Sequence, residues 1–104
     1  MNVTDILKLE NYSDKGPLKE IFYDNGNIKA QVICLKKGQS IPPCKMTNDV
    51  LFYIVKGSGI ITVDGNTGEL SAGMSAVVPK EAETRRITAY EDMFILGVQG
   101  ISGK

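Results

Sequence analysis

The sequence contains no histidine and only two cysteines. Without histidine, the chain lacks the commonest general base near neutral pH and the commonest metal ligand in proteins. The cysteines, Cys34 and Cys44, are too few for the disulfide framework of a small secreted domain, and their spacing matches no zinc-binding pattern. We therefore expect free thiols that are mostly buried in the core.

An excess of charge of either sign is also missing, because twelve Lys and Arg residues balance twelve Asp and Glu residues. No overall field attracts nucleic acid or an anionic membrane surface. The longest apolar runs, such as residues 50–55, are far shorter than the roughly 20 residues that span a bilayer. The N-terminus, MNVTDILKLE, lacks the pattern of a secretory signal. We expect a cytoplasmic protein that binds neither nucleic acid nor membranes.

What the sequence does contain is a series of short apolar runs separated by Gly, Asn, Asp and Pro, which is typical of an all-β sandwich or barrel. The length of 104 residues suits a single domain that covers residues 1–104. Asn25-Gly26 favours a tight turn and predicts a hairpin between two of the strands. The segment Gly57-Ser58-Gly59 predicts a second hairpin. The expected strands cover residues 19–24, 28–36, 50–56, 60–64, 69–71, 74–78, 84–89 and 93–98, and a helical turn is expected within residues 3–10.

The apolar residues of three central runs, residues 50–55, 74–78 and 93–98, occupy both faces of each expected strand. In a small barrel one face fills the interior, and the other face needs a further cover. A homodimer packed through its sheet faces would supply that cover. Alternatively, the two sheets of one domain cover each other alone.

Two segments carry a resemblance to a known family. Residues 38–57, GQSIPPCKMTNDVLFYIVKG, resemble the first motif of the cupin superfamily, and the start of residues 73–89, GMSAVVP, resembles the second motif. The resemblance implies a complete single-domain cupin, that is, a double-stranded β-helix or jelly-roll barrel. Residues 1–18 would form an N-terminal arm outside the barrel.

The resemblance also locates the positions at which most cupins hold a metal. The histidines and the glutamate of the first motif correspond to Cys44, Met46 and Val50. The third histidine corresponds to Thr84 by plain counting, or to Arg85 if the preceding turn holds one extra residue. None of these residues is an ordinary ligand of zinc, iron, nickel or manganese. We therefore expect no metal and no other cofactor.

Cys44 and Met46 lie two residues apart and would face the same way on a strand. A thiolate and a thioether are soft ligands that suit Cu(I), although two ligands do not complete a site. The alternative is that Cys44, Met46 and Val50 fill the former metal position as apolar core.

Arg85 and Arg86 are adjacent, so one of them should face the barrel interior, where a guanidinium is costly unless it is paired. An internal carboxylate such as Glu83 could neutralise it, or it could reach the rim. Otherwise it could anchor the carboxylate or phosphate of a ligand through two parallel hydrogen bonds.

These observations favour a metal-free barrel that binds a small, partly apolar or anionic molecule, rather than an enzyme. Two alternatives remain. One is a structural dimer whose barrel is filled, and the other is an enzyme, either a metal-independent isomerase-like cupin or a soft-metal oxidase that uses Cys44 and Met46. The candidate binding residues at the barrel mouth are Cys44, Met46, Val50, Phe52, Thr84, Arg85 and Arg86.

Overall fold

A computed structural model describes residues 1–41 and 48–100 of the chain. No helix in these residues is long and apolar enough to cross a membrane. A single 3-10 turn, η1 (Ile6–Leu9), precedes nine strands in the described ranges. The strands are β1 (Leu18–Asp24), β2 (Ile28–Leu35), β3 (Ser40–Ile41), β4 (Val50–Lys56), β5 (Ser58–Val63), β6 (Asn66–Ser71), β7 (Ser75–Val78), β8 (Arg85–Ala89) and β9 (Met93–Gly100).

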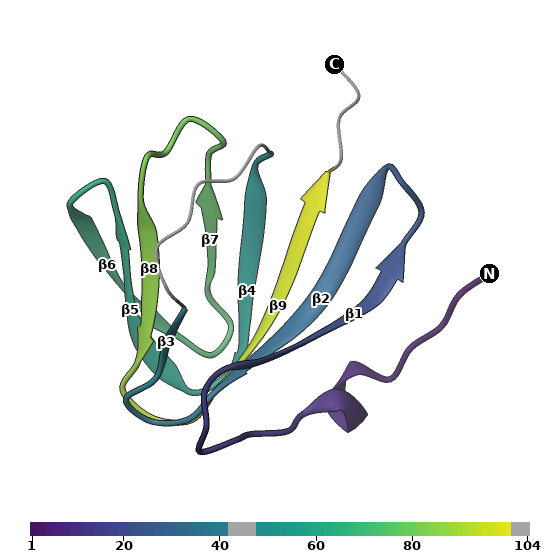
Figure 1. Cartoon of the computed structure of the whole chain (residues 1–104), viewed down its shortest axis with the longest axis horizontal. Helices are drawn as coiled ribbons and strands as arrows, with labels where there is room; N and C mark the ends of the chain where they lie inside the picture. Colours follow the sequence, from purple (N-terminus) through teal and green to yellow (C-terminus); the bar gives the residue numbers. More distant parts are fainter. Residues whose placement is uncertain (42–47, 101–104) are drawn as a thin grey trace.

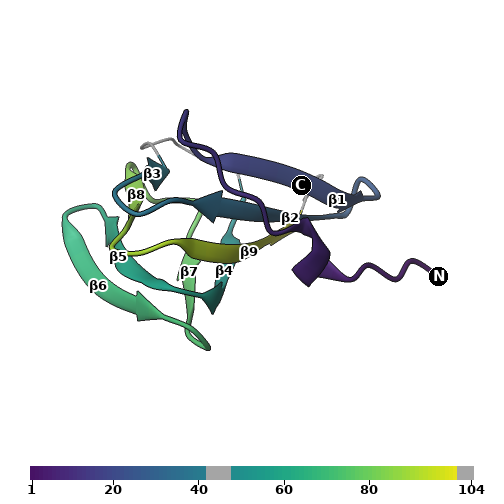
Figure 2. The same cartoon turned by 90° about the horizontal axis from the view of Figure 1, so that it is seen from below.

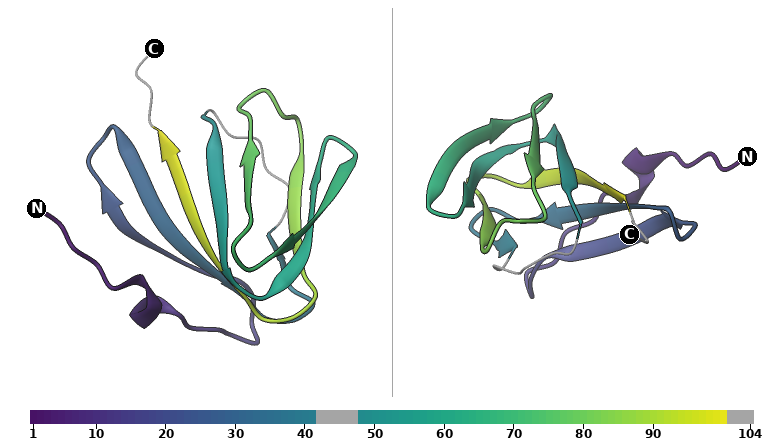
Figure 3. Two further views of the ribbon diagram at one scale, coloured as in Figure 1. Left: turned by 180° about the vertical axis from the view of Figure 1, so that it is seen from behind. Right: turned by 90° about the horizontal axis from the view of Figure 1, so that it is seen from above.

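The strands form two antiparallel sheets, which confirms the all-β class and the jelly-roll barrel. The larger sheet, sheet A, has the order β1-β2-β9-β4-β7, and the smaller sheet, sheet B, has the order β3-β8-β5-β6. Figure 1 shows that the strands of both sheets converge at one end and separate toward the other, and Figure 3 shows the same arrangement from behind and from above. We call the first the closed end and the second the mouth.

The predicted hairpin at Asn25-Gly26 is confirmed, because β1 and β2 pair directly across this turn. The predicted hairpin at Gly57-Ser58-Gly59 is wrong. Strand β4 pairs with β7 and β9, whereas β5 pairs with β6 and β8, so the chain passes from sheet A to sheet B at this point.

The backbone at the closed end explains this crossing. Gly57 has a φ of +91°, and a Cβ atom there would lie 2.1 Å from the carbonyl oxygen of Asp92. Only glycine therefore allows the chain to run this close to the start of β9. Neighbouring loops are joined by main-chain hydrogen bonds, from Gly38 N to Ala89 O and from Tyr90 N to Ser58 O, each 2.9 Å long.

The space between the sheets is filled by apolar side chains on alternate positions of the strands, as the period of a half-buried strand requires. Sheet A contributes Ile33, Leu35, Val50, Phe52, Ile54, Val78, Met93 and Ile95, and the rest of the chain contributes Ile41, Ile61, Leu70, Ala82, Ile87 and Ala89.

A second, smaller apolar cluster lies on the outer face of sheet A, where the N-terminal arm crosses β2 and β9 (Figure 2). Val32, Cys34 and Phe94 are buried there, and Ile6, Leu9, Tyr12, Phe22 and Val55 pack against them. Cys34 is free and accepts a hydrogen bond from the amide of Asn11, and burial raises the pKa of its thiol. The chain's own arm thus covers part of the face for which the sequence suggested a second sheet or a partner.

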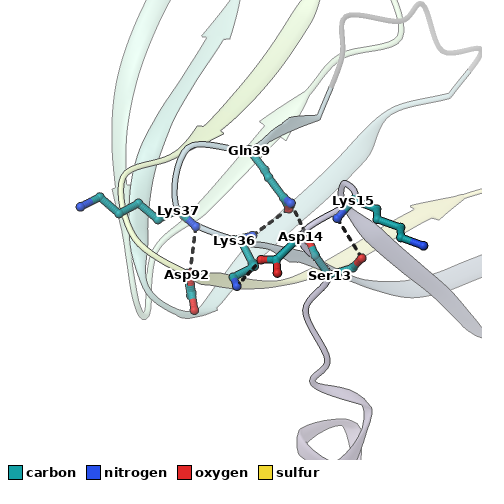
Figure 4. A network of polar contacts seen from close by, with 7 residues as sticks. All are labelled: Ser13, Asp14, Lys15, Lys36, Lys37, Gln39 and Asp92. Carbon is teal, nitrogen blue, oxygen red and sulfur yellow. Dashed lines mark hydrogen bonds and ion pairs between the residues drawn. The ribbon is translucent and has the colours of Figure 1, made fainter.

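Polar contacts fasten the arm to the closed end (Figure 4). Lys36 forms an ion pair with Asp14, and the Gln39 side chain donates to the carbonyl of Ser13 at 2.6 Å. The Gln39 side chain also accepts from the amide of Lys36, so one residue bridges the arm and the loop after β2. Asp92 accepts from the amide of Lys37, which ties that loop to the start of β9.

Glu10 is the other attachment of the arm. Its carboxylate lies 2.6 Å from the ammonium of Lys56 on β4 and accepts a hydrogen bond from the hydroxyl of Tyr12. These two bonds hold the pKa of Glu10 below its usual range. Burial, together with the bond to Glu10, raises the pKa of Tyr12.

The Glu10 attachment should make the stability of the protein depend on pH. The pKa of Glu10 is lower in the folded than in the unfolded chain. The ionised carboxylate therefore stabilises the fold fully at pH values above the unfolded pKa of about 4.3. This stabilisation is lost as the pH falls through the pKa of the folded chain. Chemical unfolding should show Glu10→Gln less stable than wild type by about 1 kcal/mol or less at pH 7 and equal to it near pH 2. Glu20→Gln, on the exposed edge strand β1, is the control, and a difference that persists near pH 2 would contradict the assignment.

Candidate functional site

The mouth of the barrel collects several of the residues predicted from the sequence. Val50 and Phe52 of β4 are buried and face the interior, and Arg85 at the start of β8 is 9% exposed and faces the same space. Thr84 and Arg86 are exposed on either side of Arg85. Cys44 and Met46 lie outside the described residues.

Asp64, in the turn between β5 and β6, sets the register that turns Arg85 inward. Its carboxylate accepts hydrogen bonds from the amides of Glu83 and Thr84, both at 2.9 Å, and its own amide donates to the carbonyl of Thr84. The next residue, Arg85, then pairs with Val63 on β5. Because Val63 packs against the interior cluster, its cross-strand neighbour points the same way.

The guanidinium of Arg85 lies over the aromatic ring of Phe52, with 5.5 Å between the Cζ atom and the ring centroid. This distance is within the range of a cation–π interaction, which is stronger where water is excluded. Phe52 is only 2% exposed, so its ring is a fixed platform. The contact therefore orients the planar guanidinium as well as stabilising it.

Two glutamines and a glycine that were absent from the sequence prediction complete the mouth. Gln99 of β9 is 8% exposed, and its Oε1 atom has no hydrogen-bond partner among the described residues. Gln31 of β2 pairs with Gly97, two residues before Gln99 on β9. A Cβ atom on Gly97 would lie 3.5 Å from the Phe52 ring and 3.6 Å from the Gln31 side chain, so the glycine leaves room between them.

A lysine and an aspartate lie next to each other on the inner face of sheet A at the mouth. By strand alternation, Lys29 shares the inner face of β2 with Gln31 and Ile33, and it pairs with Gln99 of β9. Asp24 pairs with Lys29, but its carboxylate accepts from the amide of Gly26 in the hairpin turn. Lys29 and Arg85 therefore bring two cationic side chains to the mouth, one from each sheet.

Among the described residues, little empty space remains below Arg85. A cavity of about 10 Å³ lies there, walled by Ile41, Phe52, Ile61, Val78, Arg85, Arg86 and Ile87. A cavity of this size holds about one water molecule at most. In the described part of the barrel, a ligand of Arg85 therefore has to approach from the mouth rather than lie deep between the sheets.

The chemistry of these residues does not suit a divalent metal ion. Val50 has no lone pair to donate, Arg85 carries a positive charge, and the sequence has no histidine. Among residues 1–41 and 48–100, no three Cys, Asp or Glu side chains gather as a ligand set. Zinc and iron sites need three or four converging nitrogen, oxygen or sulfur ligands.

Comparisons with known proteins agree with the observed fold. The family model described as the cupin domain matches residues 31–92 of the 104 residues. No curated protein sequence matches the chain significantly.

Solved structures share the fold over almost the whole chain. A conserved protein of unknown function from Streptococcus pyogenes has a TM-score of 0.85 at 22% identity, covering 99% of this chain and 90% of that chain. An RmlC-like cupin protein from Desulfovibrio desulfuricans has a TM-score of 0.86 at 19% identity, covering 97% of each chain. KdgF from a Halomonas species has a TM-score of 0.78 at 20% identity, covering 86% of this chain and 83% of that chain.

Proposed function

Because this chain belongs to the cupin domain family, we propose that it works as a small-molecule-binding barrel, in which Arg85 at the mouth anchors an organic anion. The observation that carries this proposal is the position of two buried polar side chains. Arg85 and Gln99 are 9% and 8% exposed, whereas the other buried side chains of the described residues are apolar. Both lie on inner faces at the mouth end, one from each sheet.

Burying the amide of Gln99 is costly, and this cost supports a functional role. A polar group removed from water without a compensating hydrogen bond costs about 1–3 kcal/mol. Gln99 carries this cost through its Oε1 atom. A leucine or methionine at position 99 would fill the space without that cost, so a ligand that pairs with the amide accounts for the glutamine.

The residues define the chemistry of the ligand. A planar guanidinium matches a carboxylate or phosphate through two parallel hydrogen bonds. Gln99 and Gln31 offer amide groups to hydroxyl or amine groups on the same molecule. The buried ring of Phe52 lies under Arg85 and fixes the plane of the guanidinium that meets the ligand. A small anion with a hydrogen-bonding group and a partly apolar body fits this set, and its recognition requires neither a metal nor a catalytic base.

A thermal-shift assay with small organic carboxylates, each paired with its uncharged amide, tests the proposal directly. At about 100 times its dissociation constant, a bound carboxylate adds about 2.7 kcal/mol of stability, which corresponds to about 10 °C or more for a domain of this size. The matching amide should give little or no shift, because it cannot replace the charged hydrogen bonds.

Variants of the two adjacent arginines provide a matched comparison. For Arg85→Met, the carboxylate should no longer raise the melting temperature above that of the same variant without ligand. The substitution nearly keeps the volume of the buried side chain but removes its charge. Arg86→Met, at the exposed neighbour, should keep the shift. The proposal fails if no carboxylate exceeds its amide in wild type, or if Arg85→Met responds as wild type does.

A further inference from the structure

Lys29 is a second cation at the mouth, and it comes from the sheet opposite Arg85. It lies near the start of β2, and its direct partner across the ladder is Gln99, near the end of β9. Figure 1 shows these two strand ends side by side at the mouth. Directly paired residues point to the same face of a sheet. Lys29 therefore stands beside the buried amide that the proposed function assigns to the ligand.

Gln99 lies between the two cations. Residues directly opposite each other in an antiparallel ladder have Cβ atoms about 5 Å apart, and diagonal neighbours are about 7–8 Å apart. Lys29 is directly opposite Gln99, and Phe52 is diagonal to it, because Phe52 pairs with Gly97. The guanidinium of Arg85 lies over the Phe52 ring. Two strand spacings separate Lys29 from this ring, which places the two cations on the order of 10 Å apart.

Lys29 is also unusual for its position in the sheet. Strands β2, β9, β4 and β7 all belong to the described ranges, and strand alternation gives their inner faces this lysine as the one charged side chain. The other inner-face residues of these strands are apolar side chains, glutamines and a glycine. A lysine whose only task was solubility would serve equally well on the outer face. Its place on the inner face therefore indicates a task inside the mouth.

The ammonium of Lys29 is available to a ligand. Among residues 1–41 and 48–100, no hydrogen bond or ion pair engages it. The carboxylate opposite it in the ladder belongs to Asp24. That carboxylate accepts from the amide of Gly26 at 3.1 Å, which directs it toward the hairpin turn. The lysine is half-buried, so its apolar stem packs in the mouth while the charged head stays hydrated.

We propose that the ligand is a dianion with an acidic group at each end, of which short dicarboxylates are the simplest class. This inference rests on the proposed function, because it assigns the first acidic group to Arg85 and adds Lys29 for the second. Gln99, between the cations, pairs with a hydroxyl or amine group on the connecting chain. Charged hydrogen bonds of about 2.8 Å at both ends leave room for a short carbon chain within the separation of about 10 Å.

Isothermal titration calorimetry with matched pairs of anions measures the preference. The pairs are glutarate with monomethyl glutarate, adipate with monomethyl adipate, and glucarate with gluconate, so that each pair differs in one acidic group. In wild type, at least one dianion should bind at least about fivefold more tightly than its monoanion. This factor is typical of one added ion pair to a partly exposed lysine.

Lys29→Met should remove this preference. The dissociation constant of the dianion should rise to that of its monoanion, whereas the monoanion, which uses Arg85, should bind as it does to wild type. Lys29→Arg keeps a cation at this position and should keep the preference. Lys37→Met removes the same charge from an exposed residue at the closed end (Figure 4). This control should also keep the preference, because it is far from the mouth.

The two ways of failing are distinguishable. If monoanions bind through Arg85 and no dianion exceeds its partner, this inference fails and the proposed function stands. If no anion of the panel binds, the proposed function fails as well. A preference that survives Lys29→Met, or that Lys37→Met removes equally, overturns the assignment to Lys29. Circular dichroism checks that each variant folds, and Lys29→Gln replaces Lys29→Met if the latter does not.

Discussion

Gly57→Ala should destabilise the protein by about 4 kcal/mol or more, which is at the upper end for a single substitution. Two effects add at this residue. Its φ of +91° is a backbone region that side chains other than hydrogen rarely adopt, and the new Cβ atom would meet the Asp92 carbonyl oxygen at 2.1 Å and the Met93 Cα at 2.9 Å. Both of these atoms belong to the backbone, so neither can rotate away. Urea unfolding followed by circular dichroism measures the loss.

Gly73→Ala separates these two effects. Gly73 has almost the same φ, +90°, but a Cβ atom there would meet nothing within 4 Å. Its substitution should therefore cost only the backbone strain, about 1–2 kcal/mol. Equal losses for the two variants would mean that the close approach between Gly57 and Asp92 is not what holds the closed end together.

Phe94→Ala should destabilise the protein by about 3–5 kcal/mol, the usual cost of removing a fully buried aromatic ring. Phe94 is completely buried, and on the outer face of sheet A its ring is enclosed by the arm rather than by sheet B. The substitution should therefore also release the arm. Hydrogen exchange of residues 6–12 should become faster by more than the global loss of stability alone would cause.

Tyr90→Ala is the matched control for this experiment. Tyr90 is an aromatic residue only four positions earlier in the chain, but its side chain is 50% exposed. The expected loss is about 0.5 kcal/mol or less, with no change in the exchange of the arm. Phe94→Ala could instead speed the hydrogen exchange of residues 6–12 only as much as the loss of global stability requires. In that case the arm is held by its polar attachments alone.

The strand pattern could be predicted from the sequence wherever the evidence was local. Asn25-Gly26 specified its hairpin because a two-residue turn of this type determines the pairing of its flanking strands. The same reasoning failed at Gly57, where a glycine of positive φ joins two strands of different sheets. One observed partner of β4 is β9, whose paired residues lie from 38 (Lys56 and Phe94) to 49 (Val50 and Gln99) residues away in the sequence, and no turn residue indicates a pairing of that range.

The candidate site was predictable only in part for a similar reason. The sequence indicated that one of two adjacent arginines faces inward, but the choice of Arg85 depends on contacts of Asp64, which lies in another turn. Gln99 falls just beyond the end of the apolar run 93–98, so strand periodicity gave no reason to include it. Strand β9 in fact continues to Gly100.

The outer face of sheet A shows a third limit of prediction from the sequence. Apolar residues on both faces of a strand predict that something covers the second face, but they do not identify the cover. The arm residues Ile6 and Leu9 supply part of it, and their spacing within a single 3-10 turn is too short for a periodic pattern to reveal. In the remaining part, Leu51 and Tyr53 of β4 and Val77 of β7 are exposed on the outer face.

The convergence of the strands at one end has a consequence for how such a barrel can diversify. Two glycines of the closed end, Gly57 and Gly59, leave no room for a side chain, because a Cβ atom at either position would overlap backbone atoms. The turns at the mouth include Gly26 and Gly65, around which a Cβ atom meets nothing within 4 Å. Substitution of these two mouth glycines therefore costs the strain of a positive φ but no overlap with backbone atoms. The mouth is thus the end of the barrel whose turns can change more, while the closed end keeps the architecture constant.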